Sequence, residues 1–120
     1  MLHKISCVNP WYNKICQKNK RVDGRCGEKY NNISKGDKIE FSCKSKSCIC
    51  LVTRVTHYPS FEQMLITEGL ENVLPGIKTI EQGIKIYRAF YSETFEKEWG
   101  ALAIAIEEDK EEDNDMDLKE

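Results

Sequence analysis

Hydrophobic and β-branched residues gather in short runs along the chain, and the length of each run indicates its structure. The longest run that suits a strand spans residues 48–58, where Ile, Val and Thr recur. Shorter strand-like runs lie at 21–26, 38–43 and 102–106. The polar stretch 44–47 contains no apolar residue and joins two of these runs. The pattern therefore predicts a sheet centred on the strand at 48–58.

Apolar residues at helical spacing fill the segments between these strands. Asn9 and Pro10 suit the start of a short helix, with Asn9 as its cap. Ser60, Thr79 and Ser92 each precede a further helical segment and can cap it. Because the helices do not alternate regularly with the strands, the pattern predicts an α+β fold class and argues against a doubly wound parallel sheet.

The composition is that of a soluble globular protein. The chain has 120 residues, of which 40% are hydrophobic and 32% charged, enough for one domain with a modest core. No run approaches the ~20 apolar residues that span a bilayer. The first seven residues lack the apolar core of a signal peptide. We therefore expect an intracellular protein, cytoplasmic or nuclear, with no membrane partner.

The charge is divided unevenly along the chain. Residues 107–120 hold nine acidic residues and two lysines, whereas residues 1–106 hold sixteen basic and eleven acidic residues, a net charge of +5. We expect residues 1–106 to form the domain and residues 107–120 to form an acidic, disordered tail. A basic body with an acidic tail suits a nucleic-acid binder whose tail competes for the same surface. A tail that only solubilises the chain end is the alternative.

The six cysteines do not follow a recognised metal-binding spacing. Cys43, Cys48 and Cys50 are separated as C-x4-C and C-x-C, not as the paired C-x2-C of zinc sites. Cys48 and Cys50 point to one face of the predicted strand, so we expect them to pack into the interior. Without a secretory signal, free thiols are expected in place of a disulfide framework. The sequence predicts no metal site and no cofactor.

Several segments, taken in order, resemble the ASCH family of the PUA-like β-barrel superfamily. The N-terminal half carries Lys20-Arg21-Val22-Asp23-Gly24-Arg25 and then residues 36–41. The C-terminal half carries the remaining matches, at residues 60–65, 68–76, 86–91 and 99–106. The resemblance implies a small PUA-like β-barrel of about five or six strands with helices covering one opening.

The resemblance also implies a cleft over the barrel that handles RNA or modified nucleosides. Asp23 and Arg25 share one face of their strand and can pair or frame the polar edge of a ligand. A surface ion pair of little energetic weight is the alternative that spacing alone allows. Basic residues are dense in the first third of the chain and aromatic residues interleave with them, which suits contact with phosphates and stacking on bases. A solvated lysine-rich surface with aromatic residues in the core is the other interpretation.

We therefore predict that the protein binds RNA or another single-stranded nucleic acid. The residues expected at its cleft are Trp11, Lys18, Lys20, Arg21, Asp23 and Arg25.

A second hypothesis follows from the same resemblance. Some bacterial relatives look like amidohydrolases that remove the acyl group of N4-acetylcytidine with a lysine, a threonine nucleophile and a glutamate. Lys20 fits the lysine position, Asp23 stands where the threonine would be, and Glu71 is the acid nearest the glutamate position. An aspartate cannot replace the hydroxyl nucleophile, although a carboxylate can act on water as a general base. Under this hypothesis the substrate is a modified nucleoside. A third hypothesis is that the protein is a protein-interaction adaptor that uses the acidic tail.

Overall fold

The computed structural model describes residues 1–109, and its five strands form one mixed sheet. The strands are β1 (Leu2–Ser6), β2 (Val22–Arg25), β3 (Lys38–Cys43), β4 (Lys46–Tyr58) and β5 (Ala101–Glu108). The helices are α1 (Trp11–Cys16), α2 (Phe61–Glu68), α3 (Leu70–Val73), α4 (Ile80–Arg88) and α5 (Glu93–Trp99), with a short 3₁₀ helix η1 (Glu28–Tyr30).

The strand order places β1 and β2 at the two edges of the sheet. The order is β1-β3-β4-β5-β2, with β1 parallel to β3 and all other pairs antiparallel. Within residues 1–109 no ladder of backbone hydrogen bonds joins β1 to β2. The sheet therefore leaves one seam open.

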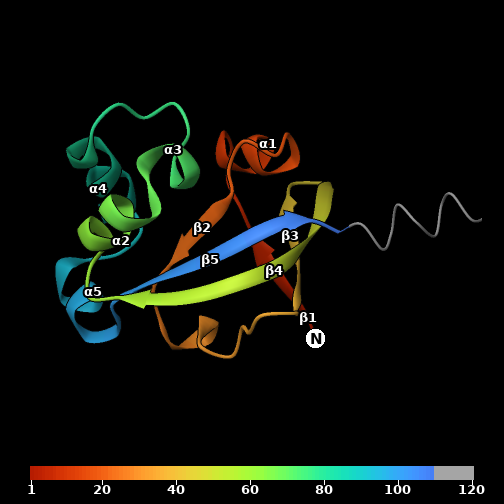
Figure 1. The fold of residues 1–120 in the computed structure, drawn as a ribbon, viewed down its shortest axis with the longest axis horizontal. Coiled ribbons are helices and arrows are strands. Elements are labelled where there is room, and N and C mark those ends of the chain that lie inside the picture. The colour runs from red at the N-terminus through yellow and green to blue at the C-terminus, as the bar shows by residue number, and fades with distance from the viewer. Residues whose placement is uncertain (110–120) are drawn as a thin grey trace, which may run out of the picture.

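The sheet is curved (Figure 1), and apolar side chains of one of its faces form the interior of a small, open barrel. Ile39, Phe41 and Ile104 are completely buried there. Tyr12 of α1 and Tyr30 of η1 belong to the same core. These two short helices thus complete the barrel core where the strands do not reach.

The helices between β4 and β5 pack against the opposite face of β5 and β2. Ala101, Ala103 and Ala105 alternate with the barrel residues along β5 and belong to the second core, with the helices. Their small side chains allow close packing, and Met64 and Leu65 of α2 are completely buried in that core. Figure 1 shows α2, α4 and α5 gathered at one end of the molecule.

Local side-chain chemistry fixes the starts of the three longest helices. The hydroxyls of Ser60, Thr79 and Ser92 each accept a hydrogen bond from the backbone N–H three residues later. These capping positions agree with the prediction from the sequence. For α1 the predicted start is one residue too early, because Pro10 and not Asn9 is the capping residue; Asn9 still accepts a hydrogen bond from the backbone N–H of Asn13 at 3.1 Å.

The predicted α+β fold class, with five strands and several helices, is confirmed, and the sheet stays open between β1 and β2. β1 was not predicted, because Ile5 is the only one of its five residues that is buried. β5 runs to Glu108, two residues beyond the expected domain boundary at 106. Asp109 is buried, and its carboxylate lies 3.1 Å from the ammonium of Lys38. The rest of the predicted tail, 110–120, lies outside the described residues.

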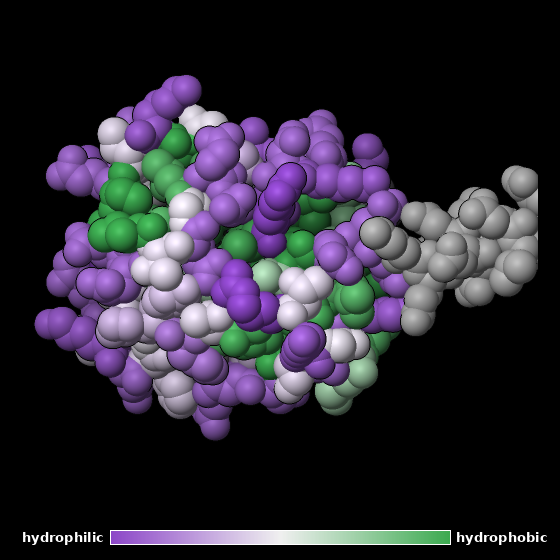
Figure 2. Space-filling view, viewed as in Figure 1, coloured by the Kyte–Doolittle hydropathy of each residue, from purple (hydrophilic) through white to green (hydrophobic). Residues whose placement is uncertain are grey.

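The surface turned toward the viewer in Figure 2 is mostly hydrophilic, with hydrophobic residues visible in smaller groups, one of them over the helical end. Among the described residues no helix is long and apolar enough to cross a membrane.

Candidate nucleic-acid interface

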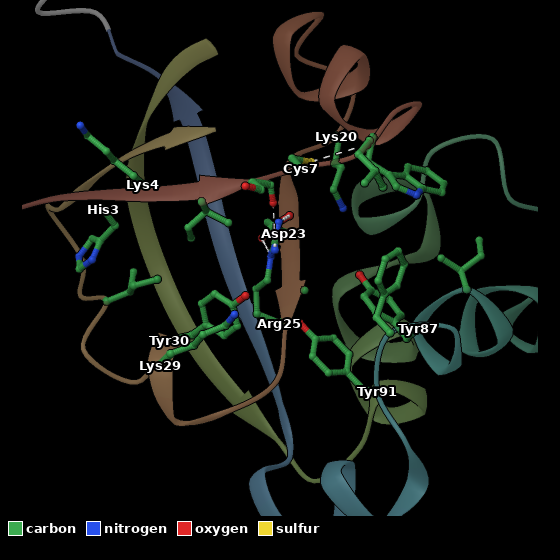
Figure 3. A pocket seen from close by; sticks show the side chains of 18 of the residues that line it. His3, Lys4, Cys7, Lys20, Asp23, Arg25, Lys29, Tyr30, Tyr87 and Tyr91 are labelled. Atoms are coloured by element: carbon green, nitrogen blue, oxygen red, sulfur yellow. Dashed lines mark hydrogen bonds and ion pairs between the residues drawn. The ribbon is translucent and has the colours of Figure 1, made fainter. Parts of the chain in front are cut away.

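A cavity of about 730 Å³ lies along the open seam between β1 and β2, and we refer to it as the cleft. β1, with the residues that follow it, forms one wall, and β2 with α4 forms the other. Figure 3 shows Lys20, Asp23 and Arg25 between these walls, with Tyr87 and Tyr91 approaching from the helical side. The cleft therefore exists because the barrel does not close.

The β1 wall offers backbone groups that no strand uses. The backbone N–H of Cys7 donates to Ser42 on β3 at 2.8 Å, and the carbonyl of Met1 accepts from Lys38 at 2.9 Å. Backbone groups alternate in direction along a strand, so the odd-numbered residues of β1 face β3. The even-numbered residues Lys4 and Ser6 therefore direct their N–H and C=O groups toward the seam.

The β2 wall, in contrast, is occupied by side chains. The backbone N–H of Ile106 donates to Arg21 at 3.0 Å, so the alternation turns the backbone groups of Val22 and Gly24 toward the seam. The ammonium of Lys20 donates to the Val22 carbonyl at 2.8 Å. The backbone of Gly24 forms a hydrogen bond with the hydroxyl of Tyr87. The β2 edge of the seam is thus capped by the side chains of Lys20 and Tyr87.

Gly24 is required for this capping. A Cβ atom at that position would overlap the hydroxyl of Tyr87 and the end of Met64. Only a residue without a side chain lets Tyr87 reach the β2 backbone so closely.

Lys20 is a buried lysine that contributes to the cleft lining. Its side chain is held by the carbonyls of Val22 and Val73, and 4% of the residue is exposed. Burial lowers the pKa of Lys20 to about 8, although the nearby charge of Asp23 opposes the shift. A substantial neutral fraction is therefore available in mildly alkaline solution.

Asp23 and Arg25 form a two-pronged ion pair in the cleft. The Nε of Arg25 lies 2.6 Å from one carboxylate oxygen of Asp23, and Nη2 lies 3.4 Å from the other. Burial opposes the charge of Arg25, but the attraction and hydrogen bonds of Asp23 outweigh it and raise the pKa of the guanidinium. The remaining nitrogen, Nη1, donates to the Ser6 carbonyl at 3.3 Å. Arg25 therefore bridges the seam from β2 to β1.

Five aromatic side chains complete the lining: Trp11, Tyr30, Tyr87, Phe90 and Tyr91. Trp11 is half-buried, and the ammonium of Lys20 lies 5.8 Å from the centre of its ring. Burial raises the pKa of Tyr91 to about 12. Its phenol is therefore neutral at physiological pH and can donate a hydrogen bond.

The cleft has an excess of positive charge. Lys4, Lys20, Arg25 and Lys29 are the basic residues of its lining, and Asp23 is the acidic one. Lys4 and Lys29 are exposed, so they can meet charged groups of a ligand without a large cost of desolvation.

Comparison with known proteins agrees with this architecture. A family model described as the ASCH domain matches residues 5–110. The chain belongs to the ASCH domain family. No curated protein matches it.

Two solved ASCH-like structures show how well the fold is shared. The crystal structure of hypothetical protein PH0355 is 40% identical with a TM-score of 0.84, and the match covers 89% of this chain and 98% of that one. The solution NMR structure of protein PF0455 from Pyrococcus furiosus is 41% identical with a TM-score of 0.75, and the match covers 89% of this chain and 96% of that one.

The ASCH cleft brings together four of the six residues that the sequence predicts for nucleic-acid binding: Trp11, Lys20, Asp23 and Arg25. Lys18 and Arg21 do not line it. The ammonium of Lys18 pairs with Glu108 at 2.8 Å, and Arg21 lines a separate depression next to Thr53. The convergence of Lys20 and Asp23 follows the motif, whereas Arg21 precedes β2 and lies outside the cleft lining.

The third residue of the hydrolase hypothesis, Glu71, lies elsewhere on the ASCH domain. It is exposed on α3 and is not part of the cleft lining. The neighbouring Glu68 is bound by Arg54 through two contacts of 2.7 Å and by the hydroxyl of Tyr58 at 2.5 Å, in the separate depression. Within residues 1–109, Asp23 is the only carboxylate that lines the cleft.

Sequence reasoning missed the β1 wall and the two tyrosines of the helical side. Tyr87 and Tyr91 have the spacing of residues on the apolar side of a helix, so they resemble ordinary core residues. The signal that could have indicated a role in the cleft is their hydroxyl groups, because a buried tyrosine hydroxyl needs a hydrogen-bond partner.

Proposed function

We propose that this ASCH domain binds single-stranded nucleic acid, with RNA as the first candidate, and admits one unpaired base to the cleft. The observation that carries the proposal is that one cavity combines excess positive charge, aromatic rings and a strand edge with which no other strand of residues 1–109 pairs. Each of these features matches a different part of a nucleotide.

The size and aromatic lining suit a base. A cleft of about 730 Å³ falls within the range of roughly 300–1,000 Å³ that is usual for small-molecule sites. Trp11 is half-buried, so part of its ring surface is open to a ligand. Stacking on an aromatic side chain tolerates any base and is typical of proteins that bind single strands.

The polar groups suit the edge of a base and its phosphate. The backbone N–H and C=O of Lys4 and the N–H of Ser6 can pair with a base edge, as one strand pairs with another. The charged ends of Lys4 and Lys29 are exposed at the cleft and can contact phosphate oxygens, which fixes the position of the strand.

Binding of a labelled single-stranded RNA, followed by fluorescence anisotropy at increasing salt, tests the proposal. Affinity should fall steeply with salt. A plot of the logarithm of the binding constant against the logarithm of the salt concentration should have a slope of about −0.7 for each phosphate contact. Trp11→Ala should weaken binding by roughly 5- to 150-fold, the equivalent of ~1–3 kcal/mol of stacking.

Two lysine variants provide the matched comparison. Lys29→Gln should make the salt slope shallower by about 0.7, because one phosphate contact is lost. Lys97→Gln should leave it unchanged, because Lys97 is exposed on α5 and does not line the cleft. Absence of RNA binding, or binding that ignores salt, would reject the proposal.

Hydrolysis of a modified nucleoside is the second candidate function. The observation that favours it is the position of Lys20, with its lowered pKa, in the same cleft as Asp23. The position of Glu71 outside that lining does not support the triad that the family resemblance implies.

A further inference from the structure

Two thiols from distant parts of the chain meet at the surface, away from the cleft. Cys16 is the last residue of α1 and Cys48 lies near the start of β4. The Sγ of Cys16 donates a hydrogen bond to the Sγ of Cys48 at 2.9 Å. A disulfide bond measures about 2.05 Å, so a small movement of the exposed end of α1 would close the gap.

We propose that Cys16 and Cys48 form a site of reversible oxidation, at which a low-molecular-weight disulfide such as oxidised glutathione converts the two thiols into an intramolecular disulfide. The bond would tie α1 to β4. It would close a loop that contains β2, η1 and β3.

The accessibility of the two thiols sets the order of the reaction. Cys16 is exposed and Cys48 is half-buried, so Cys16 is the thiol that an outside reagent reaches first. Its thiolate attacks one sulfur of the small disulfide, the S–S bond breaks, and one small thiol leaves. The thiolate of Cys48 then attacks the sulfur of Cys16 and releases the second small thiol. The protein loses two electrons and two protons, and the small disulfide gains them.

The other cysteines are less suited to this bond. Cys7, Cys26 and Cys50 are buried. Cys50 also forms a hydrogen bond with Cys48, but it is two residues away on the same strand. The Cα atoms of such a pair lie about 6.7 Å apart, close to the upper limit for a disulfide.

A metal ion is not the better explanation for the paired thiols. Within residues 1–109 there is no group of three or more His, Cys, Asp or Glu side chains that could hold one.

The surroundings of the thiols make the exchange dependent on pH. Burial and the hydrogen bond to Cys48 raise the pKa of Cys16, and the hydrogen bond to Cys50 and burial raise the pKa of Cys48. Because the thiolate is the reacting form, the rate of oxidation should increase about tenfold per pH unit between pH 7 and 8.

Treatment of the full chain with oxidised glutathione, followed by alkylation and peptide mass mapping, tests the proposal. We expect a mass loss of about 2 Da, one cross-linked peptide pair that contains Cys16 and Cys48, and full reversal by dithiothreitol. The oxidised protein should also melt roughly 5–10 °C higher, because the bond restricts the unfolded chain.

Three variants separate this pair from the other thiols. Cys16→Ser and Cys48→Ser should each abolish the mass loss and the rise in Tm. Cys43→Ser, which removes a neighbouring half-buried thiol, should change neither. Cys16 and Cys48 that stay open to alkylation, a glutathione adduct that persists on Cys16, or a cross-link to Cys43 or Cys50 would each overturn the proposal.

Discussion

Lys20 illustrates, at the scale of the residue, how burial changes the chemistry of a side chain. Two backbone carbonyls hold its amine in place, while the surrounding protein removes it from water. The sequence motif was enough to predict that Lys20 and Asp23 share a site. It could not predict the pKa of Lys20, because burial depends on Val73 and other residues that are distant in sequence.

The lowered pKa of Lys20 predicts a stability that rises in alkaline solution. The native state releases the proton near pH 8, whereas the unfolded state keeps it to about pH 10.5. Between these values the unfolded state binds more protons, so the contribution of Lys20 to the free energy of unfolding increases with pH, by up to about 3 kcal/mol. Urea unfolding from pH 7 to 10.5, compared with Lys20→Met, measures this contribution.

The comparison with the variant is necessary because the buried thiols act in the opposite direction. Burial raises the pKa of Cys7 from 9.0 to about 11, so its contribution to stability is lost between these two pH values. The difference between the two curves cancels this effect. Parallel curves for the wild type and Lys20→Met would contradict the lowered pKa.

Asp23 gives a second prediction at this scale, concerning catalysis. Its carboxylate is engaged by Arg25 at 2.6 Å, and Lys20 is engaged by backbone carbonyls. Neither group is free to activate water, so we expect no turnover of N4-acetylcytidine by the wild type above that of Asp23→Asn or Lys20→Ala. Chromatography of the cytidine released from N4-acetylcytidine by the wild type and the two variants tests this expectation. Turnover by the wild type that both variants lack would restore the hydrolase hypothesis.

At the scale of the element, the most informative strand is β1, which the sequence did not reveal. Strands such as β4 and β5 are long and rich in residues that favour sheets, so they were predictable from pattern alone. β1 has five residues and buries only Ile5, which leaves no alternation to detect. Its position depends on pairing with β3, a contact between segments more than thirty residues apart.

The free edge of β1 predicts that proline is tolerated at Ser6 but harms binding. The N–H of Ser6 points to the seam, so Ser6→Pro removes no ladder hydrogen bond and should remain folded. It does remove a donor from the cleft, and RNA affinity should fall by about 2- to 10-fold, equivalent to ~0.5–1.5 kcal/mol. Anisotropy binding and thermal unfolding provide the two measurements.

Two further variants control for other effects of this change. Ser6→Ala keeps the N–H and should bind RNA like the wild type. Ile5→Pro removes an N–H that faces β3 and should destabilise the sheet. Equal RNA affinity of folded Ser6→Pro and Ser6→Ala would show that the β1 edge takes no part in binding.

At the scale of the whole molecule, the site is a product of topology. Residues from β1, β2, η1 and α4 meet in the cleft only because the sheet curls until its two edges face each other. The family resemblance was enough to predict a cleft and a fold of five strands with several helices. It could not predict which aromatic side chains line the cleft, because Tyr87 and Tyr91 reach it through the packing of α4 on the sheet.

The unequal distribution of charge gives the last prediction. The first acidic residues of the C-terminal segment already contact basic residues of the body, since Glu108 pairs with Lys18 and Asp109 with Lys38. Neither lysine lines the cleft, but the further acidic residues of the chain carry the charge needed to compete with phosphates for the basic residues that do. Deletion of residues 110–120 should therefore strengthen RNA binding at low salt, and the gain should shrink as salt screens the charges.

A variant with the acidic residues of 110–120 changed to Asn and Gln should match the deletion, because charge and not chain length is responsible. Unchanged affinity in both variants at low salt would show that these residues do not compete with RNA.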